Sequence, residues 1–194
     1  MTQTETVLFG SCRHDELVES GFLPVGESWG ARLEVSPSVL SLCRQIVFGA
    51  EASGFECGEL GRSDLRDVVH LESLVAGDYP STPATVHEVP SLRELEALSD
   101  RGVRSFGLRH EGSLVAVTLV GLAADRAETE FTSVHPEYRR QGLSKAVKAS
   151  SILALALEGV ALFGTGGAAV NEASIRMNES LGYCITEPWV SLER

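Results

Sequence analysis

The chain has 194 residues, of which 43% are hydrophobic, and this composition excludes a disordered protein because it suffices to build a hydrophobic core. Its length fits one domain, or one domain with an appendage. The formal net charge of −11 argues against nucleic acid or an anionic membrane as a partner, since both attract clustered Lys and Arg, whereas an amine would be attracted.

The first 50 residues resemble the end of the chain in sequence. Val7–Ser11 (VLFGS) is similar to Ala161–Thr165 (ALFGT), and Glu27–Trp29 (ESW) is similar to Glu187–Trp189 (EPW). We interpret residues 1–50 as a degenerate partial copy of the final strand–helix–strand unit, followed by a linking helix at 39–48. About seven residues would be missing from the first loop of this copy. Coincidence is the alternative for a repeat of this length.

The main domain, residues 51–194, opens with a predicted strand at 55–60 and two predicted helices. Ser63 is expected to cap the first helix, with Asp64 and Asp67 in its first turn, where the helix dipole favours carboxylates. Pro80 and Pro83 end that region. The pair Ser91 and Glu94 forms a capping box for the second helix, which Gly102 closes.

Three strands and a helix are predicted next. The segments 103–109, 113–122 and 128–134 are rich in β-favouring residues, and the turns 110–112 and 124–126 separate them. The helix begins near Gly142 and places apolar residues from Leu143 to Leu157 on one face at helical spacing. Lys145 and Lys148 are expected to point away from that face.

The last part of the chain predicts a short buried strand at 160–163, a helix at 171–180 and closing strands at 182–192. The glycine-rich segment 164–167 is interpreted as a flexible loop rather than a nucleotide site, because neither GxxxxGK[ST] nor a GxGxxG after a strand is present. The whole pattern predicts an α/β (α+β) fold, with a mixed, mostly antiparallel sheet flanked by helices. Trp29 and Trp189 are expected in the core.

The four cysteines are widely spaced and include no CxxC pair, so neither a zinc site nor a disulfide framework is indicated. We expect free, buried thiols and no bound metal. The N-terminus has no basic start followed by an apolar run, and no segment has the length of a membrane span. These features predict a cytoplasmic protein.

The segment with the most chemical information is 131–146, FTSVHPEYRRQGLSKA, where a predicted strand turns into a helix through a basic loop that contains a glycine. Unpaired N–H groups at a helix start, together with the positive end of the helix dipole, bind anions. Gly142 lets the backbone approach closely, and Arg139 and Arg140 add positive charge. The sequence therefore predicts a phosphate site here.

This segment resembles the acetyl-CoA-binding motif of the GCN5-related N-acetyltransferases, which is Arg or Gln, two residues, Gly, one residue, then Gly or Ala. Arg139, Gly142 and Ser144 occupy these places, with Ser144 in place of the smaller residue. A second match, 165–183, resembles the final helix and strand of the same superfamily. The resemblance covers about 55–194 and is similar in style to mycothiol synthase, in which paired domains are frequent.

The resemblance implies a role for each part of the site. The strand residues would hold the pantetheine arm through their backbone, the loop and helix start would bind the pyrophosphate, and Asn171 would lie near the cofactor while also capping its helix. The implied cofactor-binding residues are Thr132, Ser133, Val134, Arg139, Arg140, Gln141, Gly142, Leu143, Ser144 and Asn171.

The general base must take a proton from the attacking ammonium. Glu128 and Glu130 lie two residues apart on one strand and so on one face, and Glu130 is our first candidate. The alternative is that both carboxylates only solvate an exposed strand. His135 is a further candidate. Asn178 stands where many members of the superfamily place the tyrosine that protonates the leaving thiolate.

The sequence thus predicts an acetyl-CoA-dependent N-acetyltransferase that acts on a primary amine of a small molecule or peptide. The alternative is a non-catalytic acyl-CoA-binding or sensor protein, which Asn178 favours. The region 65–100, including Asp78–Pro80, would shape the acceptor pocket, and its sequence does not identify the acceptor. The N-terminal fragment has free strand edges that would pair either within the chain or across a homodimer, and we predict self-association.

Overall fold

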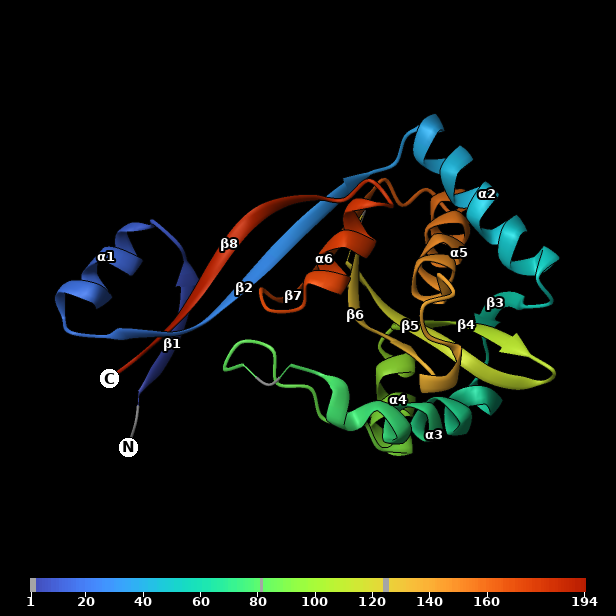
Figure 1. The fold of residues 1–194 in the computed structure, drawn as a ribbon, viewed down its shortest axis with the longest axis horizontal. Coiled ribbons are helices and arrows are strands. Elements are labelled where there is room, and N and C mark those ends of the chain that lie inside the picture. The colour runs from blue at the N-terminus through green and yellow to red at the C-terminus, as the bar shows by residue number, and fades with distance from the viewer. Residues whose placement is uncertain (1–2, 81, 124–125) are drawn as a thin grey trace. The chain divides into compact units, whose positions relative to one another are not determined.

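The computed structural model describes residues 3–80, 82–123 and 126–194, and the predicted turn residues 124 and 125 lie outside this part of the chain (Figure 1). The chain forms two compact units. The terminal unit comprises Met1–Arg32, Tyr79–His87 and Thr165–Arg194, and the central unit comprises Leu33–Asp78 and Glu88–Gly164.

The terminal unit is built from strands of both chain ends. Its strand order is β1-β8-β2-β7, and β8 pairs antiparallel with both β1 and β2. The elements, labelled in Figure 1, are β1 (Thr4–Leu8), α1 (Cys12–Glu19), β2 (Leu23–Glu34), β7 (Leu162–Ala168), α6 (Glu172–Glu179) and β8 (Cys184–Glu193). Leu17 of α1 packs with Phe22, Val190 and Leu192 in a small core.

The two ends of the chain share one local architecture. Each runs strand, eight-residue helix, strand, and each helix has a side-chain N-cap, Ser11 for α1 and Asn171 for α6. Three residues separate β1 from α1 and β7 from α6, so the two loops are equally long. The N-terminal segment is nevertheless shorter, because β1 ends at Leu8 whereas β7 continues from the matching Leu162 to Ala168, so the missing residues belong to the strand and not to the loop. That residues 1–50 are a partial copy of the C-terminal unit stays our interpretation.

The glycines of β7 form part of a strand, so the prediction of a flexible loop at 164–167 is wrong. A Cβ on Gly166 would lie 2.7 Å from the carbonyl oxygen of Trp29, and one on Gly167 would lie 3.3 Å from the Trp29 ring. Trp29 is 5% exposed and its indole N–H donates to the Ala168 carbonyl at 3.2 Å. Glycine is required at position 166 because the Trp29 carbonyl leaves no room for a Cβ, and at position 167 a Cβ would crowd the Trp29 ring. Trp29 is in the core as predicted, whereas Trp189 is only partly buried.

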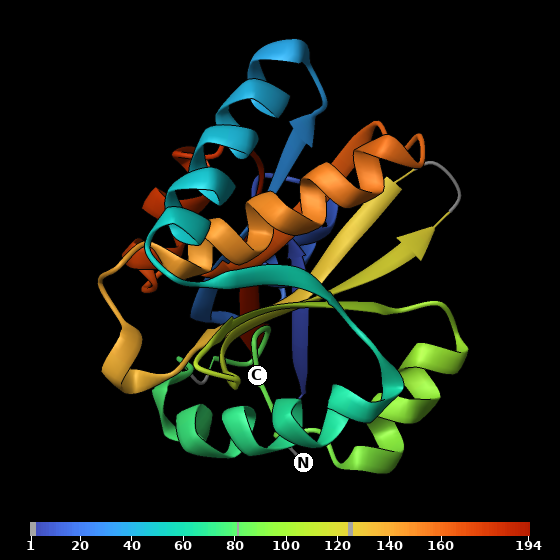
Figure 2. The same ribbon diagram turned by 90° about the vertical axis from the view of Figure 1, so that its right-hand side faces the viewer.

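The central unit is a layered α/β structure (Figure 2). Its strand order is β7-β6-β5-β4-β3, antiparallel except for β6 and β7. The helices α2 and α5 cover one face and α3 and α4 cover the other. The bounds are α2 (Pro37–Ala52), β3 (Glu56–Leu60), α3 (Leu65–Val75), α4 (Leu92–Asp100), β4 (Arg104–His110), β5 (Ser113–Ala123), β6 (Arg126–Val134) and α5 (Leu143–Leu157).

The starts of α3 and α4 differ in how far local sequence determines them. The capping box of α4 is confirmed, because Ser91 Oγ accepts from the Glu94 N–H while the Glu94 carboxylate accepts from the Ser91 N–H. Ser63 does not cap α3. It lies inside a 3₁₀ turn, η1 (Arg62–Asp64), where the Asp64 carboxylate instead accepts from the Gly61 N–H at 2.8 Å.

Helix α5 is buried on more than one side, because it lies between the sheet and α2. Lys148 is therefore 2% exposed, and the expectation that it points away from the core is wrong. Burial lowers the pKa of Lys148 to about 7, because desolvation penalises the charged amine.

The four cysteines are free thiols, as predicted, but only Cys43 is fully buried and Cys12 and Cys184 are exposed. Burial raises the pKa of the Cys43 thiol to about 11, which makes it a poor nucleophile. Among the described residues, no helix combines the length and apolar character needed to cross a bilayer.

Candidate functional site

One edge of β6 is paired with β7 near the start of the strand and, among the described residues, unpaired further along it. Near its start, three residues pair parallel with β7, from Arg126 opposite Leu162 to Glu128 opposite Gly164. No further β7 partner follows for the described residues of β6, which continue to Val134 paired with β5 alone. The second half of β6 therefore offers backbone groups on a strand edge to a ligand.

A β-bulge at Glu130 lies where this edge becomes free. The register with β5 shifts between Thr129 opposite Val120 and Phe131 opposite Leu119, so Glu130 is the extra residue. The bulge places Glu128, before it, and Phe131, after it, on the same face of the sheet. Bulges re-aim side chains and are frequent beside active sites.

The two candidate bases lie close to one glycine. Glu128 is opposite Gly121 across the sheet, and a Cβ on Gly121 would lie 2.8 Å from the Glu130 carboxylate. The predicted shared face of Glu128 and Glu130 is thus confirmed, although the bulge contributes to it. Glu130 is exposed, and Glu128 lies 3.8 Å from the guanidinium of Arg126.

The hydrogen bonding of β6 to β5 decides which backbone groups face the free edge. The His135 N–H donates to the Val115 carbonyl at 2.9 Å, which sets the alternation along the antiparallel pair. Ser133 therefore directs its N–H and C=O to β5, while those of Thr132 and Val134 point to the other edge. The side chains of Thr132 and Thr118 are hydrogen-bonded at 2.8 Å, which steadies this part of the strand.

The loop between β6 and α5 is built around two residues in the left-handed region. It runs through a 3₁₀ turn, η3 (Pro136–Tyr138), then Arg139 and Arg140, with φ +62° at Arg140 and φ +78° at Gly142. Gly142 is the N-cap of α5, and nothing lies within 4 Å of where its Cβ would be. The glycine is needed for its φ and leaves open space above the helix start.

The start of α5 differs from that of every other α-helix in the described part of the chain. Its N-cap has no side chain, and its first turn carries no acidic residue, whereas each other helix has a capping side chain or an acid there. The first intrahelical bond joins the Ala146 N–H to the Gly142 carbonyl, so the N–H groups of Leu143, Ser144 and Lys145 have no helical partner. Unpaired N–H groups at a helix start are suited to binding an anion, which agrees with the phosphate site predicted from the sequence.

The two loop arginines have different environments. The Arg139 guanidinium donates from Nε to the Val134 carbonyl at 3.3 Å and from Nη2 to the Asp78 carboxylate at 2.5 Å. Asp78 ends a 3₁₀ turn, η2 (Ala76–Asp78), directly after α3. Arg139 therefore ties the loop to its surroundings, while Arg140 is exposed beside the open helix start.

Aromatic side chains anchor the loop from behind. The Tyr138 hydroxyl lies 3.3 Å from His110 Nδ1, and the Phe55 ring packs on both His110 and Tyr138. His135 packs against Tyr138, and its Nδ1 accepts from the Glu137 N–H at 3.3 Å. These contacts give His135 a structural role in the loop and weaken it as a candidate base.

A buried carboxylate on α3, which the sequence did not single out, contacts β6. Glu72 is 0% exposed and accepts a short hydrogen bond from the hydroxyl of Ser133, itself 4% exposed. The two residues are 61 positions apart, and Glu72 lies in a helical pattern that otherwise reads as an ordinary apolar face. A polar residue among the core positions of α3 was the only available signal.

Two predicted site residues belong to the terminal unit. Asn171 caps α6, as expected, with its side-chain oxygen accepting from the Ser174 N–H at 3.1 Å. Asn178 is 2% exposed near the end of the same helix and donates to the Ser174 carbonyl at 2.9 Å. The local contacts of Asn178 are thus those of a buried helix residue.

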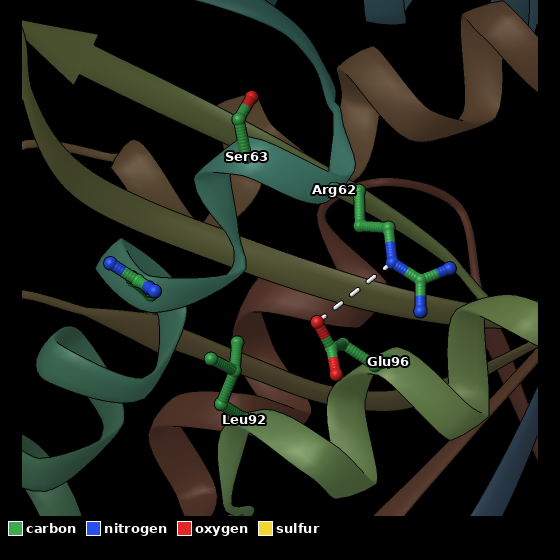
Figure 3. A pocket seen from close by; sticks show the side chains of 5 residues that line it. Arg62, Ser63, Leu92 and Glu96 are labelled. Atoms are coloured by element: carbon green, nitrogen blue, oxygen red, sulfur yellow. Dashed lines mark ion pairs between the residues drawn. The ribbon is translucent and has the colours of Figure 1, made fainter.

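A pocket of about 430 Å³ lies at the start of α3, lined by Arg62, Ser63, Arg66, Leu92 and Glu96 (Figure 3). Arg62 forms ion pairs with Glu96 at 3.8 Å and Asp100 at 2.7 Å. Asp78, which contacts the loop, follows the other end of this 11-residue helix, about 16 Å away along its axis. The pocket is therefore separate from the loop site.

The exposure of Arg140 leads to a prediction. If the loop binds the pyrophosphate of CoA, as the sequence predicts, Arg140→Gln should weaken binding of CoA about fivefold and reduce the dependence of the affinity on salt, because ions screen the attraction between an exposed guanidinium and an anion. Calorimetric titration with CoA at two salt concentrations measures both effects. Arg93→Gln, on the exposed surface of α4, is the control. An unchanged salt dependence in Arg140→Gln would contradict the assignment.

The fold defines a class: an α/β protein in which a bulged strand, free at one edge in its second half, leads into a helix that begins at a glycine without a capping side chain. Residues 70–183 match the family model described as the acetyltransferase (GNAT) family. The chain therefore belongs to the GNAT acetyltransferase family, and the fold predicted from the sequence is confirmed.

Among relatives, the [ribosomal protein bS18]-alanine N-acetyltransferase of Escherichia coli K12 is 34% identical over 118 residues, 58% of this chain and 79% of that protein. The mycothiol acetyltransferase of Corynebacterium glutamicum is 43% identical over 65 residues, 31% of this chain and 22% of that protein. A GCN5-related N-acetyltransferase structure from Sphaerobacter thermophilus has a TM-score of 0.75 at 14% identity, covering 100% of this chain and 59% of that one. The chain thus spans about four fifths of the E. coli relative, about a fifth of the C. glutamicum relative and about three fifths of the S. thermophilus protein.

Proposed function

We propose that the protein transfers the acetyl group of acetyl-CoA to a primary amine. The observation that carries this proposal is the start of α5, where Gly142 and the absence of a capping side chain or an acid leave three backbone N–H groups for a pyrophosphate. Arg140 and the helix dipole add positive potential at the same point, in a chain whose net charge is −11.

The free edge of β6 fits the rest of the cofactor. The N–H and C=O of Thr132 and the N–H of Val134 point to that edge and are suited to the amides of a pantetheine arm, which pairs with a strand as a peptide does. The Val134 carbonyl already accepts from Arg139. The loop follows directly at Val134, so one continuous segment, 132–144, offers amide partners and then a phosphate site. Ser133 in this scheme faces β5 with its backbone and α3 with its side chain.

The reaction needs a group that accepts a proton from the attacking ammonium. As the nitrogen bonds to the thioester carbon and the C–S bond breaks, one proton leaves the amine and the CoA thiolate takes one up. Glu130, exposed at the bulge and two residues before Thr132, is our candidate base, with Glu128 as the second choice. A backbone N–H released by the bulge would stabilise the oxyanion.

The candidate base leads to a second prediction. We expect Glu130→Gln to lower kcat by 10²–10³ while the affinity for acetyl-CoA stays within twofold, because the variant keeps the shape and loses only the basic group. Glu128→Gln is the matched variant two residues away, with an expected effect below tenfold. If Glu128→Gln proved the more damaging of the two, the roles of the glutamates would be exchanged.

One experiment separates the proposed transferase from the alternative, a non-catalytic acyl-CoA-binding or sensor protein. Acetyl-CoA binding is measured by calorimetry, and CoA thiol release is followed in the same samples with a panel of amines that includes amino acids, small diamines and peptides with a free N-terminus. Binding with amine-dependent thiol release supports the transferase. Binding without thiol release with any amine favours the acyl-CoA-binding protein. If the folded protein does not bind acetyl-CoA, both candidate functions are refuted.

The alternative function rests on Asn178. If this residue stands at the position of the general acid, its amide cannot protonate a thiolate, and its N–H group is already bonded to the Ser174 carbonyl. The loss is tolerable for a transferase because a CoA thiolate is a stable leaving group that solvent can protonate. We therefore favour the transferase.

The E. coli relative is named for an alanine of ribosomal protein bS18, and the C. glutamicum relative for mycothiol. Of these, the first matches over the greater length, which places a peptide α-amine first in the acceptor panel. We also propose, from the shared strand–helix–strand architecture, that residues 1–50 are a partial repeat. Homodimer formation stays a prediction that sedimentation or light scattering tests.

A further inference from the structure

The segment formed by α3 and η2 contacts the cofactor strand at two neighbouring points. Glu72, near the end of α3, accepts from the Ser133 hydroxyl, and Asp78, at the end of η2, pairs with Arg139 at 2.5 Å. Arg139 in turn donates to the Val134 carbonyl at 3.3 Å. The two contacts therefore hold the chain on either side of Val134, where β6 ends and the loop begins.

These points matter because Thr132 and Val134 direct their backbone groups to the free edge of β6, while Ser133 directs its own to β5. A strand that is paired on one edge only can twist or fray at its end. The Ser133 side chain is on the face that meets α3, and its bond to Glu72 restricts rotation of the strand about its own axis.

Glu72 is buried in the core, where a carboxylate needs a reason other than contact with water. A carboxylate that is 0% exposed is costly unless it is hydrogen-bonded, and Glu72 occupies a core position beside Leu71 and Val75, where an apolar residue would pack without that cost. Both Glu72 and Ser133 also have other interaction partners. A polar bond retained inside the core fixes the geometry of the groups that it joins more narrowly than apolar packing does.

We propose that Glu72 is a positioning residue that acts through Ser133 to hold the free edge of β6 in the geometry that binds the pantetheine arm of acetyl-CoA. Glu72 does not touch the cofactor in this scheme. It fixes the strand from the opposite face, and Asp78 and Arg139 fix the following loop. This inference rests on the proposed function, because it assigns the edge of β6 to acetyl-CoA.

The test compares four variants by calorimetry with CoA: Ser133→Ala, Glu72→Gln, Glu72→Leu and the double variant Glu72→Leu with Ser133→Ala. The double variant replaces both members of the bond by apolar groups, which removes the cost of leaving one of them unpaired with the other, although it also ends their remaining interactions. Positioning predicts a full binding stoichiometry with the Kd raised about tenfold in Ser133→Ala and in the double variant. Glu72→Gln keeps an acceptor for the Ser133 hydroxyl and should stay within threefold of wild type.

A merely structural role gives a different pattern. Variants would then bind with the wild-type Kd and a reduced stoichiometry, in proportion to the fraction of protein that is unfolded, and the melting temperature alone would fall. A double variant that is folded and binds CoA like wild type would overturn the inference. If Glu72→Leu does not fold, Ser133→Ala decides the question, because it removes only the hydroxyl that donates to Glu72. A Kd raised at full stoichiometry supports the inference, and a wild-type Kd contradicts it.

The matched control is Thr118→Ala. Thr118 is 0% exposed and is hydrogen-bonded to Thr132 from the neighbouring strand, so its loss removes a buried hydroxyl without touching the α3 contact. A smaller rise in Kd than in Ser133→Ala supports the proposal, and an equal or larger rise contradicts the special role of α3. If the wild type itself does not bind CoA, the proposed function is refuted. That outcome differs from a failure of the inference about Glu72, in which the wild type binds CoA and the variants bind it equally well.

Discussion

Gly142→Asp is expected to abolish detectable binding of acetyl-CoA while the protein stays as stable as wild type. The new carboxylate would stand at the N-cap of α5, where it accepts from the N–H groups of the first turn. The same groups are the proposed pyrophosphate donors, so the side chain both occupies them and repels the anion. We expect a loss of at least about 100-fold in affinity.

Stability should be preserved because two effects offset each other. A non-glycine residue at φ +78° costs about 1 kcal/mol, and an aspartate N-cap returns a similar amount. No atom lies within 4 Å of the added Cβ, so steric overlap does not contribute. Unfolding in urea, followed by circular dichroism, checks this point alongside calorimetric titration with CoA.

Gly142→Asn is the matched control. Asparagine has the shape of aspartate, tolerates the left-handed region and caps helices, but carries no charge. We expect its affinity for CoA to fall about tenfold, between wild type and Gly142→Asp. Equal losses in the two variants would show that occupancy of the helix start, rather than charge, excludes the ligand. If Gly142→Asp bound CoA with the wild-type affinity, the start of α5 would not be the pyrophosphate site.

The parts of the site that the sequence predicted are those with local causes. The α4 capping box follows from Ser91 and Glu94, three residues apart, and the helix start of α5 follows from Gly142 after two arginines. Both depend on contacts within one turn, which short patterns report. The family motif lies in the same local segment, which is why it led to the fold.

The parts that it did not predict depend on residues far apart in the chain. The bulge at Glu130 is set by the register with β5, which alternation within β6 does not reveal. The partner of Ser133 is 61 residues away on α3. The glycines of β7 look like a loop until Trp29, more than 130 residues earlier, is placed on them.

Lys148 illustrates the same point through a single side chain. Helical spacing gave α5 one apolar face and placed Lys148 outside it, but α2 and the sheet cover α5 from two directions. A helix interior to a layer is buried on more than its apolar stripe, and periodicity alone does not report this. The consequence is a buried amine whose charge can be measured through stability.

Lys148→Met is expected to raise the free energy of unfolding at pH 7, by at most on the order of 4 kcal/mol if the unfolded chain has the ordinary lysine pKa. The gain is reduced by the interaction that Lys148 makes and methionine loses. The pKa of Lys148 is lowered to about 7 by burial, from 10.5. The folded state must therefore either release a proton or bury a charge, and methionine of similar length removes that cost while it fills the space.

The sign of the pH dependence follows from the same shift. Between pH 7 and 10.5 the unfolded state binds more protons at this site than the folded state does, so the stability of the wild type should rise with pH. The slope is on the order of 1 kcal/mol per pH unit at most, and it should disappear in Lys148→Met. Urea unfolding at pH 7, 8 and 9 measures both curves.

The chain contains one other lysine, Lys145, one turn earlier on the same helix and partly exposed, and Lys145→Met is the control. It removes the same charge from α5 at a site that keeps contact with water, so its stability curve should run parallel to that of the wild type between pH 7 and 9. Parallel curves for the wild type and Lys148→Met would mean that the amine is solvated or stays charged in the fold. A stability gain confined to Lys148→Met, and shrinking as pH rises, identifies the buried amine as its source.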